Sequence, residues 1–408
     1  MLDDKVKVEA KVIRTDASIG LQPQGEAKLQ VIGHIPYTAD FGTVKLVLQG
    51  KDKGADNTEK LEDLVELSAA ASSFEIPAVP VGEVWSQREK GRSYDLQVKS
   101  VDTYQGSTAD TLAIQLVMSN REPRHQQVGQ RVAFLKTADG TLFPAKLSEV
   151  KDKIAPEGKA LLLASVTLPK GYRTDGAQLV VGDAVVGGAI SGTDVGLAGP
   201  TNSADTASAA SSAAASATTA ASGSTAASAS PPAAAPEAKD TSLDGYIHAA
   251  AFGLPQEVTE PKSGVKDIDL YPYTLSLRQF ATSVNFITNE LNVKFKYKLD
   301  KDPFVKADTA GHRIQMEVVD GGDTALHFSE TMDLENPSGT VREEDGTTPV
   351  GILKLGEERT FQFTKVDKDI GFGLQYSHQY TIRIYHVLPS GDKKWIAAQK
   401  FDWFNVSE

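Results

Sequence analysis

Histidines are the residues of this chain best suited to hold a metal ion or to move a proton at neutral pH. Zinc sites space their histidines as in H-E-x-x-H, and no pair in this sequence follows such a spacing. His312 and His327 flank a predicted Asp-Gly turn and could meet across the hairpin. Histidines on strand surfaces explain the pattern equally well, so we predict no metal site and no cofactor. The seven histidines are His34, His125, His248, His312, His327, His378 and His386.

Nucleophilic chemistry has little support in the sequence. Ser148-x-x-Lys151 has the spacing of the nucleophile in penicillin-recognising enzymes, but the companion Ser-Asp-Asn and Lys-Thr-Gly elements are missing. No nucleophile elbow, phosphate-binding loop or dinucleotide-binding glycine pattern occurs. The chain contains no cysteine, which excludes thiolate sites and disulfides. We therefore predict no catalytic residue and no enzyme, with a hydrolase or metal-dependent enzyme outside these motifs as the remaining alternative.

Short acidic pairs lie in predicted loops and could bind calcium or simply face water. None has the twelve-residue spacing of an EF-hand, so both interpretations stay open. The net charge of -12 and the pI near 5.2 argue against nucleic acid or an anionic membrane as the main partner, because binding to either needs clustered basic residues. No apolar run is long enough to span a membrane. The pairs are Asp300 with Asp302, Asp320 with Asp323, and Asp367 with Asp369.

Aromatic residues concentrate near the C-terminus and supply the best candidate for a binding surface. Trp403 and Phe404 are neighbours, so on a strand they point to opposite faces, and we expect at least one of them to be exposed or at an interface. With Trp395 and Tyr376 they could form a platform for sugar rings. The same alternation is also what a sheet core requires, and the sequence does not separate the two uses.

These candidates depend on strands that an apolar rhythm predicts. Tyr94-x-Leu96-x-Val98 is followed, after thirteen residues, by Leu112-x-Ile114-x-Leu116. Tyr273-x-Leu275-x-Leu277 is followed, again after thirteen residues, by Leu291-x-Val293-x-Phe295. Strict alternation is the period of a strand with one face on a core. The repeated spacing predicts two copies of one all-β unit.

The predicted organisation is a tandem of antiparallel Ig-like β-sandwiches. Residues 94–200 contain about seven strands with regular turns, a pattern typical of Ig-like sandwiches. Residues 240–408 repeat it. Residues 1–93 look like a diverged or incomplete sandwich, with an amphipathic helix or a loop between Asp52 and Ser73. Residues 201–239 are almost entirely Ala, Ser, Thr, Gly and Pro, which predicts a disordered linker that lets the halves move independently.

Paired apolar strands, an Asp-Gly turn at Asp139-Gly140 and the Ala/Ser/Thr/Pro spacer resemble the Ig-like, telokin-like modules of surface proteins and lipoproteins of Gram-positive bacteria. The resemblance implies an extracellular or cell-surface location and a role in contact, and it assigns no functional residue. The N-terminus lacks the apolar segment of a signal peptide, so we expect a mature form or a fragment.

The sequence thus favours a non-catalytic exported protein acting in surface structure, adhesion or assembly. Its partners would be cell-wall polysaccharide, another surface protein or a second copy of itself. The alternative is a carbohydrate-binding accessory module of a larger secreted enzyme.

Overall fold

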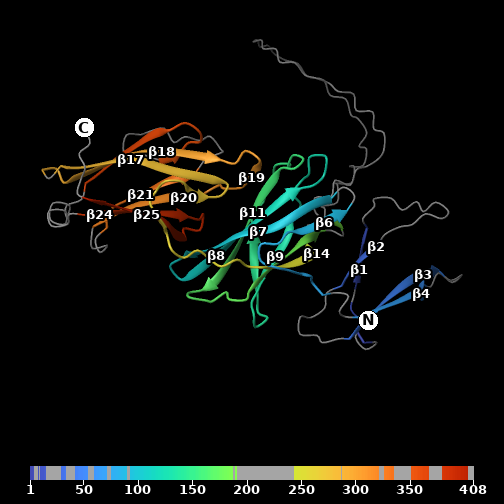
Figure 1. Cartoon of the computed structure of the whole chain (residues 1–408). Coiled ribbons are helices and arrows are strands. Elements are labelled where there is room, and N and C mark those ends of the chain that lie inside the picture. Colours follow the sequence, from blue (N-terminus) through green and yellow to red (C-terminus); the bar gives the residue numbers. More distant parts are fainter. Residues whose placement is uncertain are drawn as a thin grey trace, which may run out of the picture.

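A computed structural model describes residues 1–3, 8, 10–14, 29–33, 42–53, 59–70, 75–89, 92–186, 189–190, 243–285, 287–320, 326–334, 351–366 and 379–402. The described residues form strands, turns and short connections and no helix, so this part of the chain is all-β (Figure 1). No helix long and apolar enough to cross a membrane occurs among them.

The middle module consists of two sheets. The first has the order β6-β7-β8-β11, and the second has the order β10-β9-β12-β14-β5. All these pairs are antiparallel except β14 with β5. The bounds are β5 (Ala78–Val79), β6 (Trp85–Glu89), β7 (Arg92–Gln105), β8 (Ala109–Asn120), β9 (Arg131–Lys136), β10 (Leu142–Leu147), β11 (Lys159–Pro169), β12 (Gln178–Val186) and β14 (Leu243–Gly253), with β13 (Ala189–Ile190) folded back on β12.

The last module repeats this arrangement. Its first sheet has the order β16-β17-β18-β23. Its second has the order β22-β21-β20-β24-β25-β15, where β22 is parallel to β21 and β15 is parallel to β25. The bounds are β15 (Lys262–Ser263), β16 (Ile268–Leu270), β17 (Tyr273–Asn285), β18 (Glu290–Lys301), β19 (Val305–Ala307), β20 (Arg313–Asp320), β21 (Leu326–Leu334), β22 (Gly351–Leu353), β23 (Arg359–Val366), β24 (Gln379–Val387) and β25 (Lys393–Asp402).

Each module has its own core, and the repeated apolar pattern lies in it. Tyr94 begins the pattern in the middle module and Tyr273 begins it in the last, and both are almost completely buried. All twelve positions of the two patterns are at most 5% exposed. The predicted hairpins are therefore confirmed as β7–β8 and β17–β18, and each contains a register shift in its first strand.

The boundary between the two modules lies one strand later than the predicted start at 240. β14 follows the low-complexity segment, yet it pairs with β12 of the middle module, and Leu243 stands opposite Val186. Phe252 of β14 belongs to the middle core. The predicted linker 201–239 lies outside the described residues, but the strands that flank it, β13 and β14, both pair with β12 in one sheet. The segment therefore connects two strands of one module.

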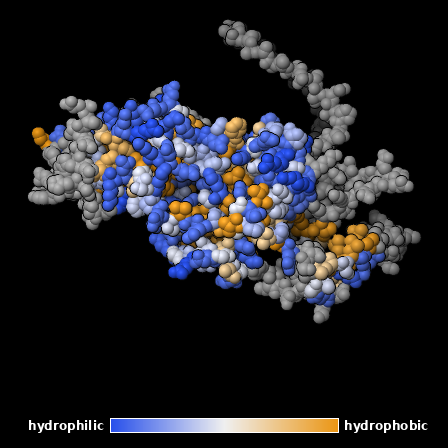
Figure 2. Space-filling model, viewed as in Figure 1, coloured by the Kyte–Doolittle hydropathy of each residue, from blue (hydrophilic) through white to orange (hydrophobic). Residues whose placement is uncertain are grey.

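The described part of the N-terminal region consists of two two-stranded sheets. They are β1 (Ala10–Arg14) with β2 (Leu29–Gly33) and β3 (Thr43–Lys53) with β4 (Glu59–Ala70). The predicted helix or loop between Asp52 and Ser73 is wrong, because β4 pairs along its length with β3. Leu48 and Val65 face each other in this hairpin and are each 45% exposed, which contributes to the apolar surface at this end of the molecule (Figure 2).

Candidate functional site at the interface of the modules

The two modules are joined by strand pairing and by a polar interface. β19 pairs in parallel with β11, and Lys393 of β25 pairs with Gln105 of β7. The Lys394 Nζ donates to Asp102 at 2.6 Å and to Glu257 at 3.2 Å. Charge-assisted hydrogen bonds of this kind are stronger than neutral ones. The interface therefore holds the modules side by side (Figure 1).

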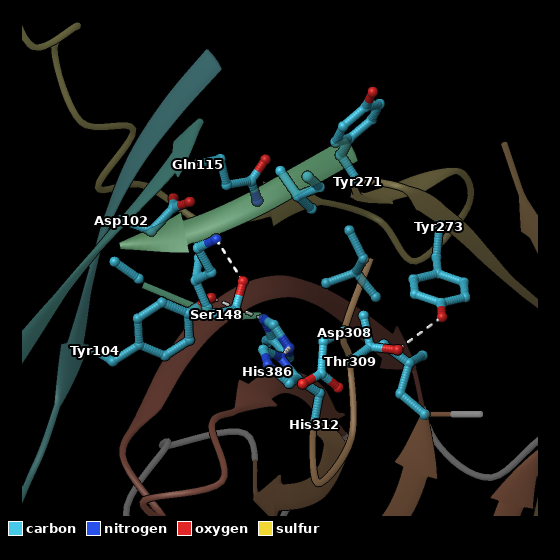
Figure 3. Close-up of a pocket in the computed structure, with 15 residues that line it drawn as sticks. Asp102, Tyr104, Gln115, Ser148, Tyr271, Tyr273, Asp308, Thr309, His312 and His386 are labelled. Carbon is cyan, nitrogen blue, oxygen red and sulfur yellow. Dashed lines mark hydrogen bonds between the residues drawn. The ribbon is translucent and has the colours of Figure 1, made fainter. Parts of the chain in front are cut away.

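A cavity of about 30 Å³ lies in this interface, and three rings form its most distinctive wall (Figure 3). The Tyr104 Oη is 2.7 Å from Nδ1 of His386. The Nε2 of His386 is 3.0 Å from Nδ1 of His312. Tyr104 comes from β7 of the middle module, whereas the histidines come from β24 and from the turn before β20. The chain of rings thus crosses from one module to the other.

One assignment of protons satisfies this chain with both histidines neutral. The Tyr104 hydroxyl donates to His386, whose Nε2–H donates to His312. Burial, together with the neighbouring His312, lowers the pKa of His386 to about 3. Burial also lowers the pKa of His312, although Asp308 opposes the shift. Burial raises the pKa of Tyr104. All three groups are therefore uncharged near neutral pH.

The cavity is suited to ordered water and too small for an organic substrate. Its volume admits about two water molecules. The buried Oε1 of Gln115, on its wall, has no hydrogen-bond donor among the described protein atoms and is a natural partner for such a water. The Ser148 Oγ accepts a hydrogen bond from the Leu163 backbone N–H. This serine thus has a structural contact, and Lys151 lies outside the wall of this cavity.

A second polar cluster lies inside the middle module around Asp183. This carboxylate is 1% exposed and pairs with Arg131 at 2.7 Å and Arg92 at 3.0 Å. It also accepts from the Tyr94 hydroxyl at 2.9 Å and lies 3.2 Å from Nδ1 of His248. Burial alone would raise the pKa of Asp183, but Arg131 and the other partners lower it to about 2. The cluster ties β7, β9, β12 and β14 together.

The predicted aromatic surface is described only at Trp395. Its side chain lies beside Tyr385 with ring centroids 6.4 Å apart, and the residue is 36% exposed. Arg383 lies over the Trp395 ring at 5.1 Å, and Lys393 lies over the Tyr385 ring at 4.6 Å. Cations therefore already cover one face of each ring. Tyr376, Trp403 and Phe404, the other predicted members, lie outside the described residues.

The remaining candidates from the sequence are dispersed. His312 contacts His386. The side chain of His327, which the sequence suggested could meet His312, lies outside the described residues. Among the described residues, no group of three His, Asp or Glu side chains is placed to hold a metal ion. Asp300 forms an ion pair with Lys298 at 2.8 Å, and Asp302 accepts from the Phe304 backbone N–H.

Sequence reasoning missed both clusters because their members are far apart in the chain. Tyr104 and His386 are 282 residues apart, and Tyr94 and Asp183 are 89 apart. The one available signal was polarity inside an apolar run, since Asp183 interrupts Val180-Val181-Gly182 and Ala184-Val185-Val186. A carboxylate in such a strand requires buried partners.

Comparisons with known proteins give no family. No family model matches the chain, and no curated protein matches it. A solved structure of a DUF4785 family protein from Legionella pneumophila is similar over 85% of this chain and 63% of that one, with 8% identity and a TM-score of 0.18. This chain thus spans less than two thirds of that protein's length.

Proposed function

We propose that this chain is a non-catalytic, exported cell-surface protein that acts in surface structure, adhesion or assembly through two Ig-like β-sandwich modules. The observation that carries the proposal is the interface, where strand pairing and buried hydrogen bonds join the modules. The order of strands is similar in the two modules, and each has a short edge strand in a parallel pair: β5 with β14, and β15 with β25. This repeated order supports the Ig-like assignment. Two sandwiches that are held together in this way suit a role in surface structure or in binding to other molecules at the cell surface.

The polar clusters support the same proposal, because their side chains hold strands or modules together. His386 is engaged on both ring nitrogens, and Asp183 is surrounded by four side chains. A catalytic group needs access to a substrate of some size. The interface cavity, at about 30 Å³, gives that access to water alone.

Two measurements on the full chain test this proposal. Cell fractionation with surface labelling should find the protein outside the membrane of its native cells. Pull-down with isolated cell walls, together with sedimentation at increasing protein concentration, should detect wall binding or self-association. A cytoplasmic protein that binds no wall material and stays monomeric would contradict the proposal.

Carbohydrate binding remains the second candidate because Trp395 is exposed beside Tyr385. Sugar rings stack on free aromatic faces, so a ligand would have to displace Arg383 or Lys393 from the rings that they cover. Loss of wall binding in Trp395→Ala, with Val258→Ala as an exposed control, would favour this candidate over assembly.

A further inference from the structure

One covalent connection and one contact surface, here named the joint, hold the two modules together. The chain passes from β14 of the middle module to β15 of the last module once, through residues 254–261. Glu257 in this connection accepts from the Thr103 backbone N–H at 2.6 Å and from the Thr103 hydroxyl at 2.7 Å, which fixes the connection to β7. The joint itself is non-covalent. It can therefore open while the chain between the modules stays intact.

The joint has little apolar surface of its own. Its buried apolar cluster consists of Tyr104, Ala113 and Leu388, with Leu163 packed against them. Strand pairing adds three residue pairs between β11 and β19 and one between β7 and β25. The core of each module is a much larger cluster. We therefore expect the joint to open at a lower free energy than either module unfolds.

Closing the joint buries His386 between neutral groups. Its ring lies between Tyr104 of the middle module and His312 of its own module (Figure 3). Neither partner carries a negative charge near neutral pH, so neither compensates a proton added to His386. Burial and His312 hold the pKa of His386 at about 3, and burial also lowers the pKa of His312. The closed joint thus disfavours the charged form of both histidines.

The charged groups around these rings are largely engaged with one another. Lys394, which stands opposite His386 in the pairing of β24 with β25, binds both Asp102 and Glu257. Asp308 opposes the shift of His312 and so weakens the contribution of that histidine. The charged side chains at the joint are Asp102 of β7, Glu257 of the connection, Asp308 of the turn before β20, Asp392 of the turn after β24, where it accepts from Thr111 of β8, and Lys394 of β25.

Opening the joint removes the burial that keeps His386 neutral. In water a histidine has a pKa near 6.5. Below that pH the open form binds a proton that the closed form does not bind until about pH 3. Each unit of pH below about 6.5 therefore raises the ratio of open to closed molecules about tenfold, and His312 adds to this rise. Above about pH 6.5 these histidines leave the ratio unchanged.

We propose that the joint is released by acid: protonation of His386 and His312 separates two folded modules that stay linked through residues 254–261. At neutral pH the joint is closed. As the pH falls below about 6, the modules part more often and expose the apolar cluster between them. This inference does not depend on the proposed surface role, and it gives the interface a regulatory use.

Cysteine reporters test the proposal on the full chain, which has no cysteine of its own. Ala113→Cys places a thiol in the joint, and Ala164→Cys places a matched thiol in the core of the middle module; these alanines are 1% and 0% exposed. The rate of reaction with 4,4′-dithiodipyridine, divided by the rate of free cysteine at the same pH, measures how often each site opens. From pH 7.5 to 5.0 this relative rate should rise about 30-fold for Ala113→Cys from His386 alone. It should stay at least about 100-fold lower for Ala164→Cys.

A rise of less than about threefold in Ala113→Cys would overturn the proposal, and so would equal relative rates at the two sites, which would mean that acid unfolds the whole protein. Leu388→Cys, 3% exposed on the other side of the joint, is a second reporter if Ala113→Cys fails to fold. Adding His386→Asn to the reporter should lower the rise at least about fivefold. His125→Asn, at an exposed histidine outside the cavity wall, is the matched control and should leave the rise unchanged. An undiminished rise in the His386→Asn protein would refute the role of that histidine.

Discussion

Cutting the low-complexity segment distinguishes a tether between modules from an insertion within one module. A protease site placed between Ala220 and Ala221 allows the folded protein to be cleaved at one point. If the segment only linked two independent modules, the products would separate. Because β14 lies between β12 and β5, we expect the products to remain associated.

The size of the effect follows from the way β12 holds both ends of residues 191–242, because Ile190 pairs with Val185 and Leu243 pairs with Val186. Coil statistics give a chain of about 52 residues a root-mean-square length of roughly 40 Å, and hence an effective concentration on the order of 10 mM. At about 10 µM protein, cleavage lowers the concentration that β14 experiences about 1,000-fold. This corresponds to about 4 kcal/mol of lost stability.

The assay is size-exclusion chromatography and thermal unfolding before and after cleavage. The cleaved protein should elute as one complex. Its free energy of unfolding should increase by about 1.4 kcal/mol for each tenfold increase in protein concentration, so the unfolding temperature should rise with concentration. Phe252→Ala should weaken the cleaved complex further, because Phe252 is 1% exposed in the middle core. Two folded products that elute separately at about 10 µM would refute the reasoning.

Three further predictions concern the buried polar groups. The pKa of His386 is lowered to about 3 in the folded protein. In the unfolded chain this histidine takes up a proton as the pH falls through about 6.5, whereas in the folded protein it stays neutral until about pH 3. Stability should be full above about pH 6.5 and fall by about 1.4 kcal/mol per unit toward pH 3, and His386→Asn should flatten this slope in denaturant titrations. Asp183→Asn leaves two buried guanidinium groups without their carboxylate and should cost about 3 to 5 kcal/mol in urea unfolding. Tyr94→Phe removes a hydroxyl that contacts both Asp183 and Arg131 and should cost about 2 kcal/mol in urea unfolding. An unchanged free energy of unfolding would contradict the role of this hydroxyl in the cluster.

The apolar alternation predicted the two central hairpins because each is local. β7 and β8 are consecutive, and their facing side chains alternate with the strand period, so the pairing can be read without knowledge of distant partners. The segment containing β4 was harder. Leu61, Leu64 and Val65 fit a helical spacing, and only pairing with β3 selects the strand. Short apolar runs are ambiguous until a partner is known.

Composition located the unusual segment but could not place it in the fold. Between β24 and β25 the corresponding connection runs only from Leu388 to Asp392, with a tight turn at Gly391. Long connections between adjacent strands cost little more entropy than short ones, because the cost of loop closure grows with the logarithm of length. A low-complexity run is thus tolerated inside a module, and the sequence alone does not distinguish that from a linker.

The duplicated fold carries different chemistry in its two copies. Tyr94 lies near the start of β7 and Tyr273 begins β17, the equivalent strand of the other module. The hydroxyl of Tyr94 contacts the buried carboxylate of Asp183, whereas that of Tyr273 contacts Thr309. The two copies therefore share the alternating apolar residues that form the core face of the strands. They differ in the polar groups that contact the tyrosine hydroxyls. His386, near the end of β24, is a further example, because its Nδ1 finds its hydrogen-bond partner in Tyr104 of the other module. The ring chain at the interface thus depends on the way the two copies are joined, whereas the Asp183 cluster is built within one copy.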